Sequence, residues 1–511
     1  MSRLRLRLAL ALAAAGLVAC SDDPGVSVNP DAAVDAAIDA PNGPGAYDDP
    51  ADFDHTGCVA GSLAGFDPQG IYHLRIDFEG FESTTAARFD VLAPGQFGGL
   101  IAAGDATRAV ATADDLFLYR ELDAGNTRTL DLCAKSGGDL TGQYAFCNSQ
   151  GCFLGTVTAR KVERLAEAPA SGLTLVGEYH DPAWPAGIGV NVRVDGHLAY
   201  LARYQDGLRI LDIADPAHPT EVGHAPTEDA TMREIYNDVK IVHAAGRTYA
   251  LMCSNKVGAV VWDVTTPATP VLVAHMGTAA GAGAIDVHTI FVDGGRAYLG
   301  NIDVGLEIYD VADPAHPVRL GGLPPPAGSG DIFLHDLYVH GARAYLNFWA
   351  AGMVIADVSN PAAPTVVGTF ANYGETSSHS SWVTQVGGRM IAAHGDEQWG
   401  SHLRLVDVTE GTPGFLAPTA EYKTRDEVSA HNVMAFGSTV YMAYYQDGIR
   451  VIDIADPAHP RLTAWYNTWP GYDRGYGKSF FEGAVGLDVD LAARRIYVAD
   501  SNRDLMILAL P

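Results

Sequence analysis

The sequence predicts an all-β protein in which a seven-bladed β-propeller follows a small disulfide-containing β-domain. The first observation is a repeated segment, because LRILDIADPAHP (208–219) returns as LEIYDVADPAHP (306–317) and IRVIDIADPAHP (449–460). The second is a period of 46 to 51 residues between the aspartates that end each apolar run: Asp212, Asp263, Asp310, Asp357, Asp407 and Asp453. The third is the composition, since 56 Gly and 28 Pro in 511 residues are typical of strands joined by many turns. A period of this length built from short strands indicates a β-propeller.

Residues 1–19 are expected to be a lipoprotein signal peptide. Three arginines precede an apolar run and small residues, which is the layout of a secretory signal. The ending LVAC resembles the lipobox of bacterial lipoproteins, which implies that Cys20 is acylated and that the exported protein is anchored to a membrane. The same resemblance implies, from Ser21 after the cysteine, a location at the outer membrane, on its periplasmic or cell-surface side. Ordinary signal cleavage near Ala19 is the alternative.

Residues 20–55 predict a disordered acidic tether rich in Ala, Asp and Pro. Such a segment has too few large apolar side chains to offset the entropy lost on ordering. The formal net charge of the whole chain is −28, and no basic patch interrupts it. A nucleic acid is therefore not an expected partner.

Residues 56–168 predict a small β-sandwich or barrel, because apolar and polar residues alternate in several runs such as IYHLRIDF (71–78). Four cysteines lie in this segment, and export would expose them to an oxidising compartment. Cys147 and Cys152 bracket a turn and are expected to pair across a hairpin. Cys58 and Cys133 then pair by elimination. A metal site is the alternative, but the spacing contains no paired C-x-x-C motifs.

Residues 172–511 predict the propeller, with four short strands in each unit. The shared turn ADPAHP suits an outer connection, because Asp215 can accept hydrogen bonds within its own turn and proline has no N–H to pair with a strand. The histidine that recurs in this turn is expected to be part of it rather than of a shared ligand site; its copies are His218, His316 and His459. The segment 173–182 predicts a fourth strand that pairs with a third strand at 505–510 and closes the ring.

The apolar runs LRILDI, VVWDV, MVIADV and IRVIDI, each followed by a P-x-x-P turn, resemble the LVIVD-repeat family of bacterial surface propellers. The resemblance covers about residues 172–511. It implies the propeller fold and says little about function, because the family has no agreed activity.

Loops at one rim of the ring carry aromatic and acidic residues that could contact a protein, a glycan or a small molecule. Solvated turns contain the same residue types, which is the alternative interpretation. The residues are Tyr204, Asp206, Asp303, Trp349, Glu397, Trp399, Tyr445 and Asp447.

Four histidines are predicted to meet at the mouth of the inner strands. His288, His335 and His431 each lie ten residues before a second-strand tyrosine, and His379 lies near the equivalent place. The same count gives Val190 and Val239 in the first two units. Converging imidazoles are suited to one transition metal, Zn, Cu or Fe. The alternative is a repeated register whose histidines bond to neighbouring loop carbonyls.

Asp336 and Asn432 each follow a ring histidine and could support the metal through second-shell hydrogen bonds. A four-histidine centre in a propeller also resembles the arrangement in carotenoid oxygenases, without the rest of their motifs.

The leading functional hypothesis is a membrane-anchored extracytoplasmic lipoprotein whose propeller is a binding or scaffolding module with an unknown ligand. The competing hypothesis is a metal-dependent enzyme, redox or hydrolytic, that uses the histidine cluster. The sequence contains no G-x-S-x-G elbow, P-loop or H-E-x-x-H motif, so it identifies no catalytic residue.

Overall fold

The computed structural model describes residues 46–511, with gaps at 79–81, 103, 123–124, 150, 186–187, 229–233, 282, 329, 372, 374–375 and 472–479. The predicted signal peptide, Cys20, Ser21 and most of the tether lie outside the described residues. The described chain forms two units, a β-domain that ends at Glu163 and a larger unit of Arg164–Pro470 and Glu482–Pro511.

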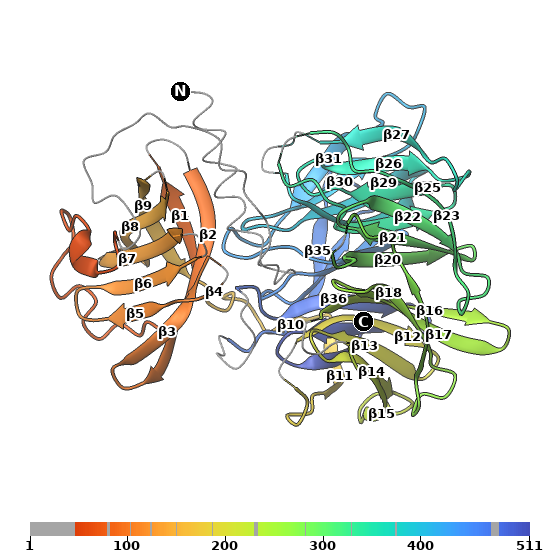
Figure 1. Ribbon diagram of the computed structural model, residues 1–511, viewed down its shortest axis with the longest axis horizontal. Coiled ribbons are helices and arrows are strands. Elements are labelled where there is room, and N and C mark those ends of the chain that lie inside the picture. Colours follow the sequence, from red (N-terminus) through yellow and green to blue (C-terminus); the bar gives the residue numbers. More distant parts are fainter. Residues whose placement is uncertain are drawn as a thin grey trace. The chain divides into compact units, whose positions relative to one another are not determined.

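The β-domain is one antiparallel sheet of nine strands in the order β4-β3-β2-β1-β9-β8-β7-β6-β5 (Figure 1). The sheet curls so that β3 also contacts β5 and β6, and it is therefore a half-barrel rather than a sandwich of two sheets. Tyr72, Phe89 and Tyr144 are among the side chains that fill its concave core. The elements are η1 (Pro50–Asp52), β1 (Gly70–Asp77), β2 (Glu82–Ala93), β3 (Gln96–Ile101), β4 (Gly104–Asp105), β5 (Arg108–Ala111), β6 (Leu116–Glu121), β7 (Thr127–Ser136), β8 (Asp139–Asn148) and β9 (Gly151–Lys161).

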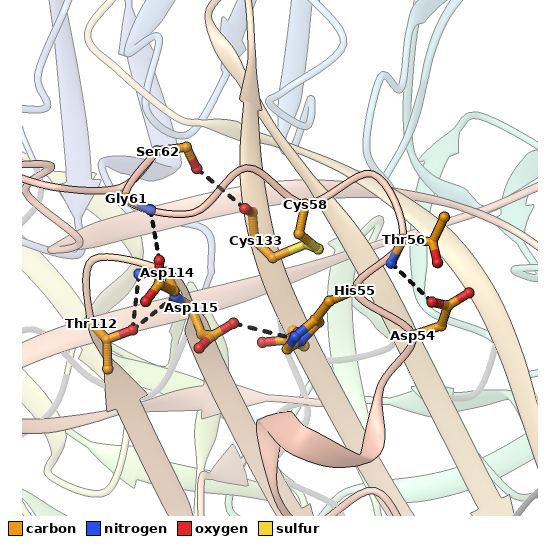
Figure 2. The surroundings of a disulfide bond; sticks show 11 residues. Asp54, His55, Thr56, Cys58, Gly61, Ser62, Thr112, Asp114, Asp115 and Cys133 are labelled. Carbon is orange, nitrogen blue, oxygen red and sulfur yellow. Dashed lines mark hydrogen bonds and ion pairs between the residues drawn. A yellow bond between two sulfur atoms is a disulfide. The ribbon is translucent and has the colours of Figure 1, made fainter.

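Both predicted disulfides are present in this domain. Cys147 and Cys152 face each other across the β8–β9 hairpin, with Cα atoms 4.0 Å apart. Cys58 and Cys133 join the segment before β1 to strand β7, with Cα atoms 5.2 Å apart (Figure 2). The small domain is thus tied at two places, which constrains its unfolded chain.

The described residues of the larger unit form seven four-stranded antiparallel blades, which confirms the predicted propeller (Figure 1). Blade 1 begins at β12 and blade 7 at β36. The inner strands are β12 (Gly189–Asp195), β16 (Tyr236–Ala244), β20 (Val287–Asp293), β24 (Asp336–His340), β28 (Ser378–Val386), β32 (Val433–Phe436) and β36 (Ala484–Asp490). The second strands are β13 (Leu198–Arg203), β17 (Arg247–Ser254), β21 (Arg296–Asn301), β25 (Arg343–Asn347), β29 (Arg389–Asp396), β33 (Thr439–Ala443) and β37 (Arg495–Asp500).

The third strands carry the apolar runs and are almost wholly buried between neighbouring blades, as such runs require. They are β14 (Gly207–Asp212), β18 (Gly258–Asp263), β22 (Gly305–Asp310), β26 (Met353–Asp357), β30 (Leu403–Asp407), β34 (Ile449–Asp453) and β38 (Asp504–Ala509). The fourth, outer strands are β15 (Thr220–Ala225), β19 (Val271–Met276), β23 (Val318–Leu323), β27 (Thr365–Phe370), β31 (Ala417–Tyr422), β35 (Arg461–Tyr466) and β11 (Thr174–Tyr179).

The ring closes through the predicted strand exchange. Strand β11, which comes first in the propeller sequence, pairs antiparallel with β38, the last strand of the chain. Thr174 lies opposite Ala509, and Tyr179 lies opposite Leu505. An additional short strand that the sequence did not predict, β10 (Ala170–Ser171), pairs with the outer strand of blade 6. Each inner strand contacts the inner strand of the next blade, including β36 with β12.

The repeated turn packs one blade against the next. Asp215 accepts hydrogen bonds from Ala217 N (3.1 Å) and lies 2.9 Å from His218 Nδ1, and the same bonds recur in the other two copies of the turn. The turn leaves no room for a side chain on the adjacent outer strand, since a Cβ at Gly177 would lie 2.2 Å from Pro216 O. The repeated segment is therefore part of the scaffold, as predicted.

None of the described residues forms a helix long and apolar enough to cross a membrane.

Candidate functional site

In blades 1, 2, 3, 5 and 7 the regular pairing between the inner and second strands is interrupted near the start of the inner strand. In blades 4 and 6 the equivalent residue comes just before the inner strand. In blade 3, Val287 pairs with Asn301 and Thr289 pairs with Gly300, so His288 between them forms a β-bulge. A bulge bends the strand and changes the direction of one side chain. We call the seven residues at this position the inner ring, and in blade order they are Val190, Asn237, His288, His335, His379, His431 and Val485.

The prediction that Val239 occupies this position in blade 2 is wrong. The count started at Tyr249, which pairs with Asp263, the last residue of its third strand. In blade 3, Tyr298 pairs with Ile308, two residues before the end of its third strand. The two tyrosines are therefore not equivalent. Asn237 takes the position instead, and its Nδ2 lies 3.0 Å from His288 Nδ1.

The structure brings the four predicted histidines together in one row. Their ring centroids are 4.2 Å apart from His288 to His335, 4.2 Å from His335 to His379, and 4.3 Å from His379 to His431. His335, His379 and His431 are buried, and His288 at the end of the row is half-buried. Consecutive blades supply consecutive rings, so the row follows directly from the propeller geometry.

Burial keeps these imidazoles neutral. It lowers the pKa of His288 to about 4 and that of His431 to about 3. The pKa of His335 and that of His379 lie well below the usual value, first because of burial and then because the rings would repel one another if charged. A neutral imidazole has a free nitrogen lone pair at physiological pH, which a metal ligand requires.

Glu397 completes the cluster with a carboxylate. It lies one residue beyond β29, in the connection to β30, and its side chain is buried. Its Oε2 is 3.4 Å from His379 Nε2 and 3.8 Å from His335 Nε2, and its Oε1 is 3.7 Å from His431 Nε2. The sequence placed Glu397 only among the rim contacts. One feature of the sequence could have placed Glu397 near the histidines: it lies between the second and third strands of the blade that carries His379.

The hydrogen bonds of the cluster leave several ring nitrogens available. His335 Nδ1 and both nitrogens of His379 have no hydrogen-bond partner among the described residues, although they are buried. His431 Nδ1 lies 2.6 Å from Val485 O. A carbonyl only accepts, so Nδ1 carries the proton and Nε2, which faces Glu397, carries the lone pair.

The spacing of the donors suits a single ion. Two ligands at about 2.1 Å from a tetrahedral metal lie about 3.4 Å apart. The Nε2 atoms of His335 and His379 lie 3.8 and 3.4 Å from Glu397 Oε2, and a ligand atom from each of these three residues lies within 4.8 Å of the others. A small inward movement of the side chains would bring all three to one ion.

Two aromatic residues support the row from the turns of blades 4 and 6. The ring of Trp349 stacks on His335 at 5.1 Å, and the ring of Tyr445 lies 4.7 Å from His431. The Tyr445 hydroxyl also donates to Glu397 Oε1. Both aromatic residues have positive φ, 34° and 37°, a conformation that is strained for a bulky side chain. Each is held there by a backbone bridge to the inner strand of the next blade.

The predicted second-shell residues lie beside a small polar cavity of about 30 Å³, room for about two water molecules. Asp336 and Asn432 line this cavity together with Asp238 and Lys240. Asp336 accepts hydrogen bonds from Thr289 Oγ1 and from the backbone N–H of Leu337, both at 2.7 Å. Burial and the nearby charge of Asp238 raise the pKa of Asp336 to about 6.

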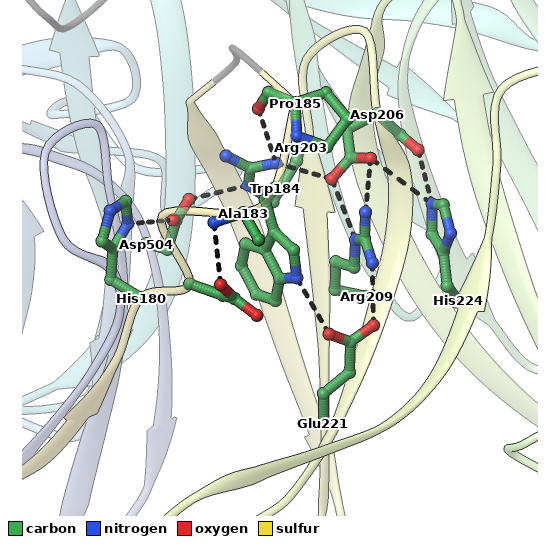
Figure 3. Close-up of polar contacts among 11 residues, drawn as sticks. His180, Ala183, Trp184, Pro185, Arg203, Asp206, Arg209, Glu221, His224 and Asp504 are labelled. Atoms are coloured by element: carbon green, nitrogen blue, oxygen red, sulfur yellow. Dashed lines mark hydrogen bonds and ion pairs between the residues drawn. The ribbon is translucent and has the colours of Figure 1, made fainter.

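Most of the predicted rim residues face inward. Asp206 is buried in ion pairs with Arg203 and Arg209 and contacts His224 (Figure 3). Burial works against its ionisation, but these hydrogen bonds and charges hold the pKa of Asp206 well below its usual value. Asp447 is likewise buried and forms an ion pair with Arg425, 2.7 Å away. Trp399 is buried, Tyr204 is half-buried and Asp303 is exposed.

The sequence profile of the LVIVD repeat matches four segments of the chain: residues 186–227, 285–322, 334–372 and 429–468. These segments fall in blades 1, 3, 4 and 6, and three of them contain an inner-ring histidine. His379 and Glu397 belong to blade 5, which the profile does not match. Among curated proteins, none matches this sequence.

Three solved structures show a distant likeness to this chain. The WD40 β-propeller domain of Doa1 is 13% identical, covers 67% of this chain and 98% of its own, and has a TM-score of 0.45. Raptor of Chaetomium thermophilum is 9% identical, covers 67% of this chain and 29% of its own, and has a TM-score of 0.48. The computationally designed Ika8 protein is 7% identical, covers 79% of this chain and 95% of its own, and has a TM-score of 0.39.

Proposed function

We propose that this LVIVD-repeat propeller is a binding module whose ligand is one transition-metal ion, held by His335, His379 and Glu397. His288 and His431 extend the donor row on either side. The observation that carries the proposal is the contact of three buried donors from two blades, of which His379 has no hydrogen bond to either ring nitrogen among the described residues.

The cost of burying ring nitrogens without hydrogen bonds supports a bound metal ion. A buried polar atom without a hydrogen bond costs about 1–3 kcal/mol. Judged on the described residues, three nitrogens of the row lack a hydrogen bond, two on His379 and one on His335. Blades 1 and 7 have valine at the same position. The fold itself therefore does not require histidine there. A metal ion bound to these buried nitrogens would offset that cost.

The donor types indicate the class of metal. Neutral imidazoles with one carboxylate suit Zn²⁺, Cu²⁺ or Fe²⁺, whereas Ca²⁺ and Mg²⁺ prefer sites made only of oxygen. The one free cysteine among the described residues, Cys253, is buried in β17 and is not part of the row. The available ligands are therefore nitrogen and oxygen.

Metal content tests the proposal. The protein, purified without chelator and then loaded with Zn²⁺, should retain one ion that the His379→Ala variant loses. The matched control is His218→Ala, which removes an exposed histidine from an outer turn and should leave the bound ion in place. Equal zinc content in wild type and His379→Ala would contradict the proposal.

Catalysis at the same metal is the second candidate, and the strained conformations of Trp349 and Tyr445 favour it, because such strain clusters at active sites. A catalytic metal keeps an open coordination position. Azide added to Co²⁺-loaded protein should then change the cobalt absorption spectrum. An unchanged spectrum would leave a binding role only.

We also propose that Cys20 anchors the protein to the outer membrane after export. The sequence LVAC and the tether that follows it support this location. The Cys20→Ser variant should move from the membrane fraction to the soluble extracytoplasmic fraction. Retention of that variant in outer membranes would contradict the anchor without affecting the metal site.

A further inference from the structure

A second cluster of possible metal ligands lies in the β-domain, remote in sequence from the propeller histidines. His55 Nε2 is 3.0 Å from Asp131 Oδ2 and 3.6 Å from Asp115 Oδ1. One ligand atom from each of the three residues lies within 4.8 Å of the others. Figure 2 shows the His55 ring directed at the Asp115 carboxylate, beside the Cys58–Cys133 disulfide.

The disulfide, strand β7 and a tight turn hold the three residues in place. Asp131 lies on β7, two residues before Cys133, and the disulfide ties Cys58 and the nearby His55 to that strand. Asp115 follows the tight turn between β5 and β6, where the backbone N–H of Asp115 donates to Thr112 Oγ1 at 2.9 Å. A backbone hydrogen bond from Leu63 N to Ala113 O holds this turn against the segment that follows Cys58.

The charges in this cluster do not balance. Two carboxylates face one imidazole, and neither forms an ion pair with a lysine or arginine in the part of the chain that the structure describes. The Asp131 side chain is only 1% exposed, and its Oδ1 has no hydrogen-bond partner among the described residues. The site therefore holds a buried carboxylate whose hydrogen bonds are incomplete among the described residues, beside a second carboxylate.

We propose that His55, Asp115 and Asp131 bind one Zn²⁺ ion, with water at the fourth position. This proposal goes beyond the metal centre of the propeller and does not depend on it. One imidazole and two carboxylates are ligands that Zn²⁺ accepts, and the separations of 3.0 and 3.6 Å bracket the spacing of about 3.4 Å expected around a tetrahedral ion. The ion neutralises the carboxylate pair and joins the segment before β1 to β6 and β7.

Zinc binding by the whole mature chain tests this site. Equilibrium dialysis measures bound zinc in wild type, in His55→Ala and in the matched control Asp114→Asn. Asp114 belongs to the same turn, but its carboxylate accepts from Gly61 N, 2.6 Å away, and not from the cluster. The His55 side chain is 38% exposed, so its removal leaves the core of the domain intact.

The expected result is that His55→Ala binds one zinc ion fewer than wild type, or binds that ion at least about tenfold more weakly, while Asp114→Asn matches wild type. Asp131→Asn, which keeps the shape of the side chain, should show the same loss. The same difference should appear when all variants carry His379→Ala, which separates this site from the propeller. Wild-type zinc stoichiometry and affinity in His55→Ala would overturn the proposal.

Discussion

The propeller uses histidine in two opposite ways. In the outer turns, His218, His316 and His459 are 81–83% exposed, and each lies within hydrogen-bond distance of an aspartate three residues earlier. In the inner ring, His379 is 1% exposed and makes no hydrogen bond to described residues. The outer histidines repeat because the turn repeats. The inner histidines occupy a position that other blades fill with valine or asparagine, so they are not required by the blade.

This difference shows how to separate scaffold from function in a repeat protein. A side chain whose hydrogen bonds are complete within its own repeat contributes to the fold. A buried polar side chain with incomplete hydrogen bonds is costly, and it persists where a ligand completes them. His335 and His379 meet the second description among the described residues.

The largest expected effect comes from breaking the scaffold itself. Deletion of residues 172–182 removes β11 and exposes the edge of β38, so the closed ring becomes open. The thermal midpoint should fall by roughly 10 °C or more. Deletion of residues 21–54, a segment with little apolar surface, should change it far less. Equal midpoints for the two deletions would show that the strand exchange does not hold the ring together.

Acid should destabilise the metal-free protein through the inner histidines. The folded pKa of His431 is about 3, below the usual value of 6.5, so the unfolded chain binds a proton that the folded chain does not. Stability is therefore lost as the pH falls below about 6.5, by about 1.4 kcal/mol per pH unit for this residue. Urea unfolding at pH 6.5 and 4.5 measures the loss, which should be smaller in His431→Leu. An identical pH dependence in the variant would contradict the assignment.

Stability and metal binding should separate at His379. The His379→Leu variant replaces two buried nitrogens, which have no hydrogen-bond partner in the part of the chain that the structure describes, with an apolar side chain of similar size. The metal-free variant should be as stable as wild type or more stable by about 1–2 kcal/mol, and it should bind no metal at the propeller. Urea unfolding in chelator checks the first part, and metal analysis checks the second. A loss of more than about 2 kcal/mol would show that His379 has a structural role.

The smallest effect is expected in the outer turn. His218→Ala removes one contact to an aspartate from a fully solvated surface, and such contacts contribute little. The unfolding free energy should change by less than about 0.5 kcal/mol. A larger destabilisation would show that the outer and inner histidines differ less than their surroundings indicate.

The sequence predicted the features that local patterns determine. The apolar third strands, the Asp215 turn, the closing pair of strands and both disulfides depend on spacing and on residue type, and the structure confirms them. The convergence of the four histidines followed from counting, because equivalent positions in consecutive blades are neighbours in space. The count failed in blade 2, where the tyrosine used as the reference lies two residues earlier in its strand.

The remaining features depend on tertiary geometry that no local pattern contains. Glu397 was visible as a rim residue, but only the path of the connection between β29 and β30 turns its carboxylate towards the histidines. His55, Asp115 and Asp131 were not singled out, because they lie far apart in the sequence and meet only through a disulfide and a turn. Asp206 and Asp447 carry charge in loops, yet arginines that the sequence did not pair with them bury both side chains.

A crystal structure of the Zn²⁺-loaded protein, with anomalous diffraction recorded at the zinc edge, would show whether the inner histidines and Glu397 bind a metal ion. We expect an anomalous peak about 2.0–2.2 Å from His335 Nε2, His379 Nε2 and Glu397 Oε2. We also expect this peak to be absent in His379→Leu. Crystals grown with excess Zn²⁺ that show these side chains in place without an anomalous peak between them would contradict the proposed metal site.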